Sequence, residues 1–168
     1  MKITLKKNLF NKSYLPYLTD YSKRYEVYYG GAGSGKSKYI TQKLIFKCLK
    51  SKRKVLVLRK VNRTTKNSTF QLLLDTLSDW NIYDKCKVNK TDFSIQLPNG
   101  SCFICMGLDD QEKLKSIAGI TDAWLEEATE FTQDDFNQVD LRIRERVDNS
   151  QIILSFNPVS KANWCYLE

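Results

Sequence analysis

The sequence contains no histidine among its 168 residues, and its five cysteines are an odd number spread widely along the chain. An odd, scattered set of cysteines argues against a disulfide framework. Cys102 and Cys105 form a C-x-x-C motif, but no second such motif and no histidine can complete a tetrahedral zinc site. We therefore expect neither a zinc site nor a disulfide, and we expect Cys102 and Cys105 to be buried structural thiols in a strand.

Long hydrophobic runs are also missing. No apolar stretch approaches the ~20 residues needed to cross a bilayer, and the basic N-terminus, MKITLKKNLFNKS, lacks the apolar segment of a secretory signal. We therefore expect no membrane partner and a cytoplasmic location. Internal repeats, low-complexity tracts and linkers are absent too, and the length suits one domain with its own core.

Acidic residues are scarce in the first half of the chain. Residues 1–90 hold 21 Lys and Arg against 5 Asp and Glu, a balance of +16, whereas residues 91–168 hold 6 against 14, a balance of −8. This asymmetry indicates a polyanionic partner for the first half. A solvated basic surface beside a phosphate site would explain the same numbers, so the composition leaves both interpretations open.

Glycine is rare except in one place, because four of the seven glycines lie within YYGGAGSGKSKYI, residues 28–40. The G-x4-G-K-S spacing is that of a phosphate-binding P-loop. Glycines let successive backbone N–H groups point into one concavity, and the following helix adds its positive dipole end. We expect Lys36 to reach the β- and γ-phosphates of ATP and the Ser37 hydroxyl to bind Mg²⁺. The expected nucleotide-binding residues are Gly30, Gly31, Ala32, Gly33, Ser34, Gly35, Lys36 and Ser37.

The pattern around this loop predicts alternating strands and helices. In DFSIQLPNGSCFICMG, polarity alternates on both sides of Pro98-Asn99-Gly100, which predicts a β-hairpin insertion near 93–106. Such an order implies an α/β fold, with a mainly parallel sheet flanked by helices and ligands beyond the carboxyl ends of the strands. The expected strands are 25–29, 54–59, 120–127 and 151–158, and the expected helices are 36–50, 65–80, 111–119 and one from Thr132 through residue 146.

Two adjacent carboxylates end the expected strand ITDAWLEE. Glu126 would act on Mg²⁺ directly or through its waters, and Glu127 would orient the attacking water. At the end of ILSFNP, a polar side chain such as Ser155 or Asn157 could sense the γ-phosphate and relay its loss. The plainer interpretations are a solvated helix start for the glutamates and strand termination for Asn-Pro.

Three segments, GGAGSGKS, ITDAWLEEATEFT and ILSFNPVS, in this order and spacing, resemble the ATPase domain of large terminase subunits. Those proteins are the DNA-packaging motors of tailed bacteriophages, and the resemblance covers nearly all of this chain. It implies a P-loop NTPase of the additional-strand catalytic-glutamate type, in which the ILSFNP strand lies between the P-loop strand and the strand of Glu126. It matches Lys36 and Ser37 to the Walker A pair, Glu126 and Glu127 to the Walker B and catalytic acids, and Asn157 to the coupling motif.

The resemblance also implies what the chain does and with what partners. ATP hydrolysis would drive double-stranded DNA into a procapsid, in the cytoplasm of a bacterial host. A portal protein and a small terminase subunit are implied partners, and the full-length motor is implied to be a homo-oligomeric ring. We expect residues 1–168 to form a single P-loop ATPase domain that is incomplete at its C-terminus and lacks the family's nuclease domain.

Two other interpretations stay open. The chain could be another P-loop enzyme, such as a helicase-like domain or a nucleotide kinase, although the paired glutamates and the SFNP strand count against a kinase. It could also be a truncated module that binds nucleotide, DNA or intact subunits without turnover. An ATPase assay with and without double-stranded DNA separates these interpretations.

An arginine is missing from the P-loop, where many family members carry one and this chain has Ala32. An arginine supplied from elsewhere is therefore needed to stabilise transition-state charge. The segment LRIRER, residues 141–146, offers three arginines near the end of an expected helix, where Arg142 and Arg146 would share a face. We expect Arg142, and after it Arg146, to act as a finger in a neighbouring subunit's site. A cationic helix end favoured by the helix dipole is the alternative.

Overall fold

The computed structural model describes residues 5, 7–61, 66–109, 111–144, 147–158, 160 and 163–166. Strands in these residues form one 7-stranded sheet in the order β1-β7-β6-β2-β5-β4-β3. Neighbouring strands from β1 to β5 run parallel, whereas β4 and β3 each run antiparallel to the strand before them in this order. The bounds are β1 Tyr25–Tyr29, β2 Lys54–Arg59, β3 Lys87–Asn89, β4 Ser94–Gln96, β5 Cys102–Gly107, β6 Asp122–Glu126 and β7 Ile152–Phe156.

The position of β7 defines the class of fold. It lies between β1, which leads into the P-loop, and β6, which ends at Glu126. This order confirms the additional strand expected for a P-loop NTPase of the catalytic-glutamate type. Because β1, β7 and β6 are parallel, their carboxyl ends meet at one edge of the sheet, where ligands of such folds bind.

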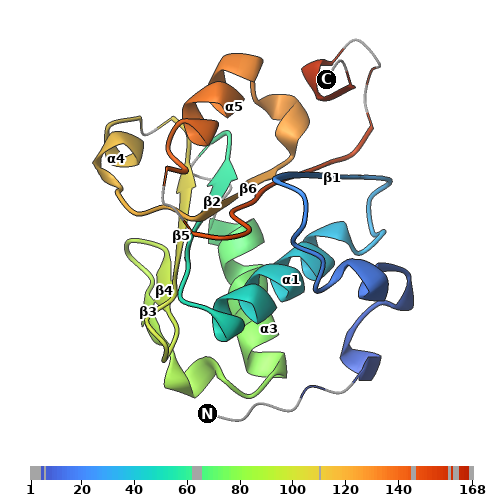
Figure 1. Cartoon of the computed structure of the whole chain (residues 1–168), viewed down its shortest axis with the longest axis vertical. Helices are drawn as coiled ribbons and strands as arrows, with labels where there is room; N and C mark the ends of the chain where they lie inside the picture. Colours follow the sequence, from blue (N-terminus) through green and yellow to red (C-terminus); the bar gives the residue numbers. More distant parts are fainter. Residues whose placement is uncertain are drawn as a thin grey trace.

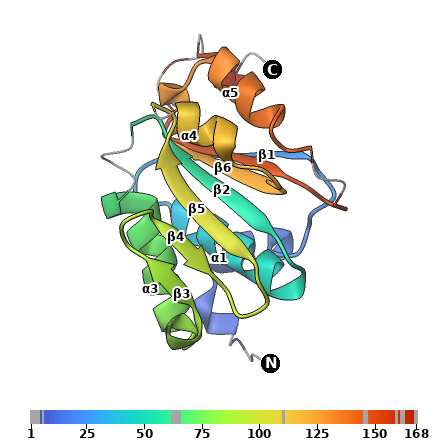
Figure 2. The ribbon, with the colours of Figure 1, turned by 90° about the vertical axis from the view of Figure 1, so that its left-hand side faces the viewer.

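Helices cover both faces of the sheet (Figures 1 and 2). α1 and α3 pack on one face, and α4 and α5 lie on the other. No helix among the described residues is long and apolar enough to span a membrane. The helix bounds are α1 Lys36–Lys50, α3 Gln71–Asp79, α4 Gln111–Ser116 and α5 Gln133–Asp140. Short helical turns are η1 Lys7–Leu9, η2 Lys12–Tyr17, η3 Lys66–Phe70, η4 Tyr83–Lys85, η5 Ala128–Glu130 and η6 Trp164–Tyr166.

Two hydrophobic clusters, one on each face of the sheet, form the core. Val55 and Val57 of β2 belong to the cluster beneath α1 and α3, whereas Leu56 and Leu58 belong to the cluster beneath α4 and α5. Both faces of β2 are therefore buried, which explains its continuous apolar run, since a central parallel strand has no solvent-facing side.

The predicted hairpin is present, because β4 pairs antiparallel with β5 and places Gln96 opposite Cys102. Its turn is closed by a hydrogen bond of 2.9 Å from the Gly100 N–H to the Leu97 carbonyl. Cys105 is fully buried as expected, but Cys102, at the start of β5, is only half-buried. Burial raises the pKa of both thiols, which keeps them protonated and unreactive at neutral pH.

Three helix predictions were wrong in their extent. The helix expected over 111–119 ends at Ser116. The expected helix 65–80 is divided into the π-helical turn η3 and α3. The helix predicted from Thr132 through residue 146 ends at Asp140, although Thr132 does cap it and exchanges hydrogen bonds with Asp135. After Asp140 the backbone tightens, with the Arg142 N–H bonded to the Val139 carbonyl at 2.9 Å. This turn buries Ile143 in the α5-side cluster while Leu141 stays exposed.

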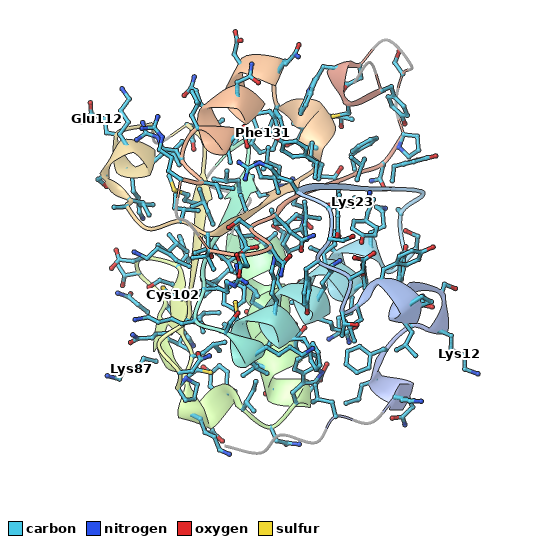
Figure 3. All side chains as sticks on the ribbon, viewed as in Figure 1. Lys12, Lys23, Lys87, Cys102, Glu112 and Phe131 are labelled. Carbon is cyan, nitrogen blue, oxygen red and sulfur yellow. The ribbon has the colours of Figure 1, made fainter. Side chains whose placement is uncertain are left out.

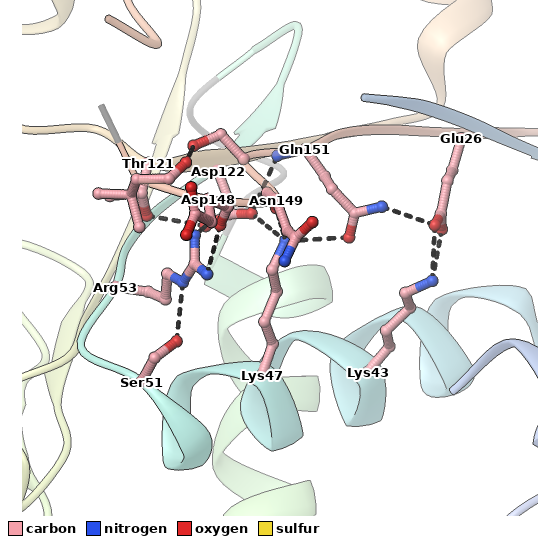
Figure 4. A network of polar contacts seen from close by, with 12 residues as sticks. Glu26, Lys43, Lys47, Ser51, Arg53, Thr121, Asp122, Asp148, Asn149 and Gln151 are labelled. Carbon is pink, nitrogen blue, oxygen red and sulfur yellow. Dashed lines mark hydrogen bonds and ion pairs between the residues drawn. The ribbon is translucent and has the colours of Figure 1, made fainter. Parts of the chain in front are cut away.

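A buried polar network joins α1 to the amino-terminal ends of the strands (Figure 4). Lys47 donates hydrogen bonds to the Asp122 carboxylate at 2.5 Å and to the Gln151 side-chain oxygen at 2.9 Å. Gln151 donates to the Glu26 carboxylate at 2.7 Å, and Lys43 binds the same carboxylate oxygen at 2.7 Å. We call these five residues the base network. Because Glu26, Asp122 and Gln151 belong to or adjoin β1, β6 and β7, the network fixes the P-loop helix against the three strands that carry the candidate site.

Candidate active site

The P-loop connects β1 to α1 at the carboxyl edge of the sheet. Gly33 and Gly35 have φ angles of +76° and +83°, in the left-handed region that glycine adopts without strain. A Cβ atom on Gly31 or Gly33 would meet nothing within 4 Å, so the loop backbone is open to a ligand. Among the described residues no side chain caps the first turn of α1, which leaves its N–H groups available to an anion.

A cavity of about 400 Å³ lies over this loop. Its volume is within the range typical of small-molecule sites, ~300–1,000 Å³. Its walls come from four elements that are far apart in the sequence and meet at the carboxyl edge of the sheet. The lining residues are Ala32, Gly33, Ser34, Gly35, Lys36, Ser37, Lys38, Leu72, Glu127, Ser155, Phe156 and Asn157. All of the predicted nucleotide-binding residues from Ala32 to Ser37 are among them.

The Lys36 side chain lies across the P-loop and is 8% exposed. Its ammonium donates hydrogen bonds to the carbonyls of Gly30 at 2.7 Å and Gly31 at 3.1 Å, and to the side-chain oxygen of Asn157 at 3.1 Å. An ammonium group has three protons to donate, and they are engaged here by neutral oxygens. A phosphate oxygen offers a charge-assisted bond in their place, so this arrangement favours an anionic ligand.

Glu126 lies at the end of β6 and is 7% exposed. Burial raises the pKa of its carboxyl, while the nearby Arg59 guanidinium and a hydrogen bond from the Ser37 side chain oppose that rise. The Arg59 Nη1 atom is 3.4 Å from a Glu126 oxygen. The structure therefore brings Ser37 and Glu126, the two predicted Mg²⁺ ligands, into contact. Their hydroxyl and carboxylate oxygens are of the kind that Mg²⁺ prefers.

Arg59 was missed by the sequence analysis. It ends β2 and lies between Glu126 and Glu130, whose carboxylate oxygen is 3.9 Å from its Nη2 atom. Its side chain is 14% exposed, so its charge acts with little screening. An arginine at the end of the apolar run VLVLR was the available signal, because that position reaches the carboxyl edge of the sheet.

Glu127 directly follows β6 and has a left-handed backbone, with φ and ψ both 54°. This bend sends the two neighbouring carboxylates in different directions, Glu126 toward Ser37 and Glu127 into the cavity. The Asn157 side-chain nitrogen is 3.5 Å from a Glu127 oxygen. Asn157 thus contacts Lys36 on one side and Glu127 on the other, which produces a continuous line of polar groups along the cavity wall.

Ser155 and Asn157 both line the cavity, as expected, but their contacts differ. The Ser155 hydroxyl accepts a hydrogen bond of 2.9 Å from the Trp124 indole, and the residue is 2% exposed. This bond gives Ser155 a structural partner within the sheet. Asn157 alone of the two bridges the lysine and the glutamate, so the geometry favours Asn157 as the residue that senses a ligand.

The arginines of LRIRER do not share a helix face as predicted, because the helix ends before them. Arg142 lies in the turn after α5 and does not line the P-loop cavity of its own chain. Arg144 is exposed and donates from Nε to the Leu141 carbonyl at 2.5 Å. Arg146 lies outside the described residues.

The sequence of the chain is similar to those of known proteins. The family model for the phage terminase large subunit matches residues 22–168. The PBSX phage terminase large subunit of Bacillus subtilis (strain 168) is 31% identical over 156 residues, which cover 93% of this chain and 36% of that protein. The terminase large subunit of Bacillus phage SPP1 is 32% identical over 107 residues, which cover 61% of this chain and 25% of that protein. The chain therefore spans little more than a third of these relatives at most.

Solved structures share the fold. The large terminase of a thermophilic bacteriophage has a TM-score of 0.81 at 17% identity, over 94% of this chain and 41% of that one. Structures of the same thermophilic-phage terminase in complex with ATP-gamma-S and with ADP have TM-scores of 0.75 and 0.76, both at 16% identity and over 95% of this chain and 41% of that one. Those nucleotide complexes belong to a protein with the fold described here.

Proposed function

The chain belongs to the family of phage terminase large subunits, and on this premise we propose that it binds ATP with Mg²⁺ and hydrolyses it to move double-stranded DNA. The observation that carries the proposal is the line of contacts from Lys36 through Asn157 to Glu127 along the wall of the P-loop cavity. The nucleotide complexes of the thermophilic-phage terminase support ATP as the ligand. A carboxylate in the position of Glu127 favours hydrolysis over kinase chemistry, since transfer to water needs a group that orients the water.

The P-loop provides the proposed phosphate site. Backbone N–H groups of residues 30–35 and the first turn of α1 surround the β- and γ-phosphates, and Lys36 exchanges its carbonyl partners for phosphate oxygens. Ser37 and Glu126 hold Mg²⁺, directly or through water, and Arg59 keeps the buried Glu126 carboxylate in place. Bound Mg²⁺ neutralises negative charge on the phosphates.

Glu127 is the proposed catalytic carboxylate. It orients a water molecule for in-line attack on the γ-phosphorus and accepts a proton from it, while the bond to the ADP oxygen breaks. Asn157 is the proposed coupling residue, because its amide contacts both Lys36 and Glu127. Lys36 changes its hydrogen-bond partners when the γ-phosphate binds or leaves. This change alters the contact between Lys36 and Asn157 and is passed on to β7, which Asn157 directly follows.

The proposed setting is a packaging motor in the cytoplasm of a bacterial host. In it, residues 1–168 form a single P-loop ATPase domain of a homo-oligomeric ring, with a portal protein and a small terminase subunit as partners and a procapsid as the destination of the DNA. Arg142 remains the proposed trans-acting finger, since its position in a turn outside its own cavity is compatible with contact to a neighbouring subunit.

Lys36→Ala is expected to weaken ATP binding by about 100-fold or more, because it removes charge-assisted bonds that contribute ~1.5–3 kcal/mol each. Titration with a fluorescent ATP analogue in Mg²⁺ measures the change. Lys50→Ala at the other end of α1 is the matched control and should bind like the parent chain. Equal affinity of the Lys36→Ala and parent chains would remove the P-loop assignment.

Release of phosphate from ATP, measured with and without double-stranded DNA, tests the proposed function itself. Hydrolysis that requires Mg²⁺ and is lost in Lys36→Ala is the expected result. Stoichiometric ATP binding without turnover, in the presence and absence of DNA, would instead identify a nucleotide-binding module.

A further inference from the structure

Several of the cations that the structure describes in the first half of the chain have internal partners for their charge. Some of them belong to the base network or to the candidate site, and others pair with single acidic residues. Lys38 pairs with Asp79 at 2.7 Å, Lys60 with Asp135 at 2.5 Å, and Arg24 with Asp140 at 2.6 Å. These pairs leave only part of the basic excess for a partner.

One gathering of lysines lies beside the turn of the β4–β5 hairpin, where β3 begins. A shallow hollow of about 170 Å³ there is lined by Lys85, Lys87, Gln96, Leu97, Pro98 and Gly100. Lys52 adjoins it, because a Cβ on Gly100 would lie 3.3 Å from the Lys52 Cε atom. No acidic residue lines the hollow, and within the described residues none of these lysines forms an ion pair. Lys52, Lys85 and Lys87, all exposed, are called the hairpin lysine surface below.

Strand pairing fixes the position of Lys87 in this surface, whereas Lys85 lies in η4 and Lys52 lies just before β2. Strand register places Lys87 opposite Gln96, Gln96 opposite Cys102, and Cys102 opposite Lys54. Paired residues share one face of a sheet, so these four side chains form a row across four strands. At ~4.8 Å between strands the row is about 14 Å long, with Lys87 at one end and Lys54, whose ammonium donates to the Ala118 carbonyl at 2.8 Å, at the other. Figure 2 shows this face of β4 and β5 toward the viewer, with α4 above and α3 below.

We propose that the hairpin lysine surface binds the phosphate backbone of double-stranded DNA. This inference rests on the proposed function and specifies where the DNA lies on the chain. Lysine is depleted at protein–protein interfaces, whereas lysine contacts to phosphates supply most of the affinity of sequence-independent DNA binding. Three exposed lysines around a hollow that also contains the Gln96 side chain, with no acidic residue in its lining, suit a phosphate backbone better than an apolar protein partner.

The surface lies at the far end of the P-loop helix. The hairpin turn is fastened to α1, since the Cys48 carbonyl accepts hydrogen bonds from the Asn99 side chain at 2.6 Å and from the Ser101 hydroxyl at 2.9 Å. α1 starts at Lys36, in the ATP site, and its 15 residues span about 22 Å at ~1.5 Å each. DNA bound at the hairpin lysine surface would therefore lie well apart from the nucleotide and contact the same helix at its other end.

The test compares two triple variants that remove equal charge. Lys52→Gln/Lys85→Gln/Lys87→Gln changes the hairpin lysine surface. Lys7→Gln/Lys12→Gln/Lys23→Gln changes exposed lysines elsewhere, and Figure 3 shows Lys12 on the opposite side of the molecule from Lys87. Binding of a short fluorescein-labelled DNA duplex of mixed sequence is measured by anisotropy at several salt concentrations. ATP binding by each variant confirms that the candidate site is intact.

The hairpin variant is expected to lower the slope of log K against log salt by about 2–3, since each phosphate contact contributes ~0.9. The control variant should keep the parent slope. The proposal would be wrong if the slope fell equally in both variants or did not fall in the hairpin variant. It would also be wrong if the parent chain did not bind the duplex. Parent binding to polyglutamate with the same slope, but not to DNA, would assign the surface to an acidic protein. None of these outcomes alters ATP turnover, which tests the proposed function separately.

Discussion

Glu127→Gln is expected to leave ATP binding unchanged and to lower hydrolysis by about 10³-fold, the middle of the range for a lost general base. The reason is the division of contacts at the site. Lys36 and the loop backbone are the proposed phosphate ligands, whereas Glu127 faces the cavity and touches only Asn157 among the polar side chains described around it. Glutamine keeps the size and the hydrogen bond to Asn157 but cannot accept the proton of the attacking water.

Single-turnover hydrolysis and fluorescent ATP titration measure the two quantities separately. Glu130→Gln is the matched control, because this carboxylate is close in sequence, half-exposed and paired with Arg59 rather than directed into the cavity. We expect it to hydrolyse ATP like the parent chain. If Glu127→Gln retained parental hydrolysis, Glu127 would be a solvated carboxylate and another group would have to activate the water.

Lys47→Met is expected to lower the free energy of unfolding by about 3–5 kcal/mol, the cost of leaving one charge of a buried pair without its partner. Asp122 and Lys47 side chains are 0% and 2% exposed and 2.5 Å apart. The other cation near Asp122, Arg53, is 3.8 Å away and is not a close substitute. Burial lowers the pKa of Lys47 and Asp122 opposes that shift, so the pair depends on both members.

Urea denaturation measures the change, and α1 supplies its own control. Lys38 is on the same helix as Lys47, and Lys38→Met breaks its exposed pair with Asp79 of α3, which should cost less than about 1 kcal/mol. Lys47→Met/Asp122→Leu should recover part of the loss, because neither charge is then left alone in the core. A loss in Lys47→Met no larger than that in Lys38→Met would show that the base network contributes little to stability.

Local patterns predicted the elements around the P-loop well. The expected strands 25–29 and 54–59 and the expected helix 36–50 coincide with β1, β2 and α1. Residues next to each of these elements set where it begins or ends, as the glycines before Lys36 do for α1. The spacing of apolar residues in each element matches the face or faces that it buries. The contact between Ser37 and Glu126 also follows from local rules, since both lie at the carboxyl edge of one parallel sheet.

The base network could not be predicted in the same way. Lys43 and Lys47 are charged residues on a helix, where exposure is the usual outcome, yet both are buried. Their partners are remote in sequence, with Asp122 75 residues and Gln151 104 residues from Lys47. Only the strand order, with β7 inserted between β1 and β6, brings these side chains together. The end of α5 was missed because a compact turn that buries Ile143 outweighs the propensity of a polar helix to continue.

The left-handed backbone of Glu127 subjects one residue to opposing selection. A side chain in this conformation costs about 1–2 kcal/mol relative to a right-handed one, and glycine relieves most of that cost. A screen for thermal stability alone would therefore favour replacement of Glu127, and a lineage released from the need to consume ATP would be free to lose it. If Glu127 has the proposed catalytic role, the substitution that stabilises the fold would also remove ATP hydrolysis, so the frequency of glutamate at this position in evolving populations would report on demand for hydrolysis rather than on demand for folding.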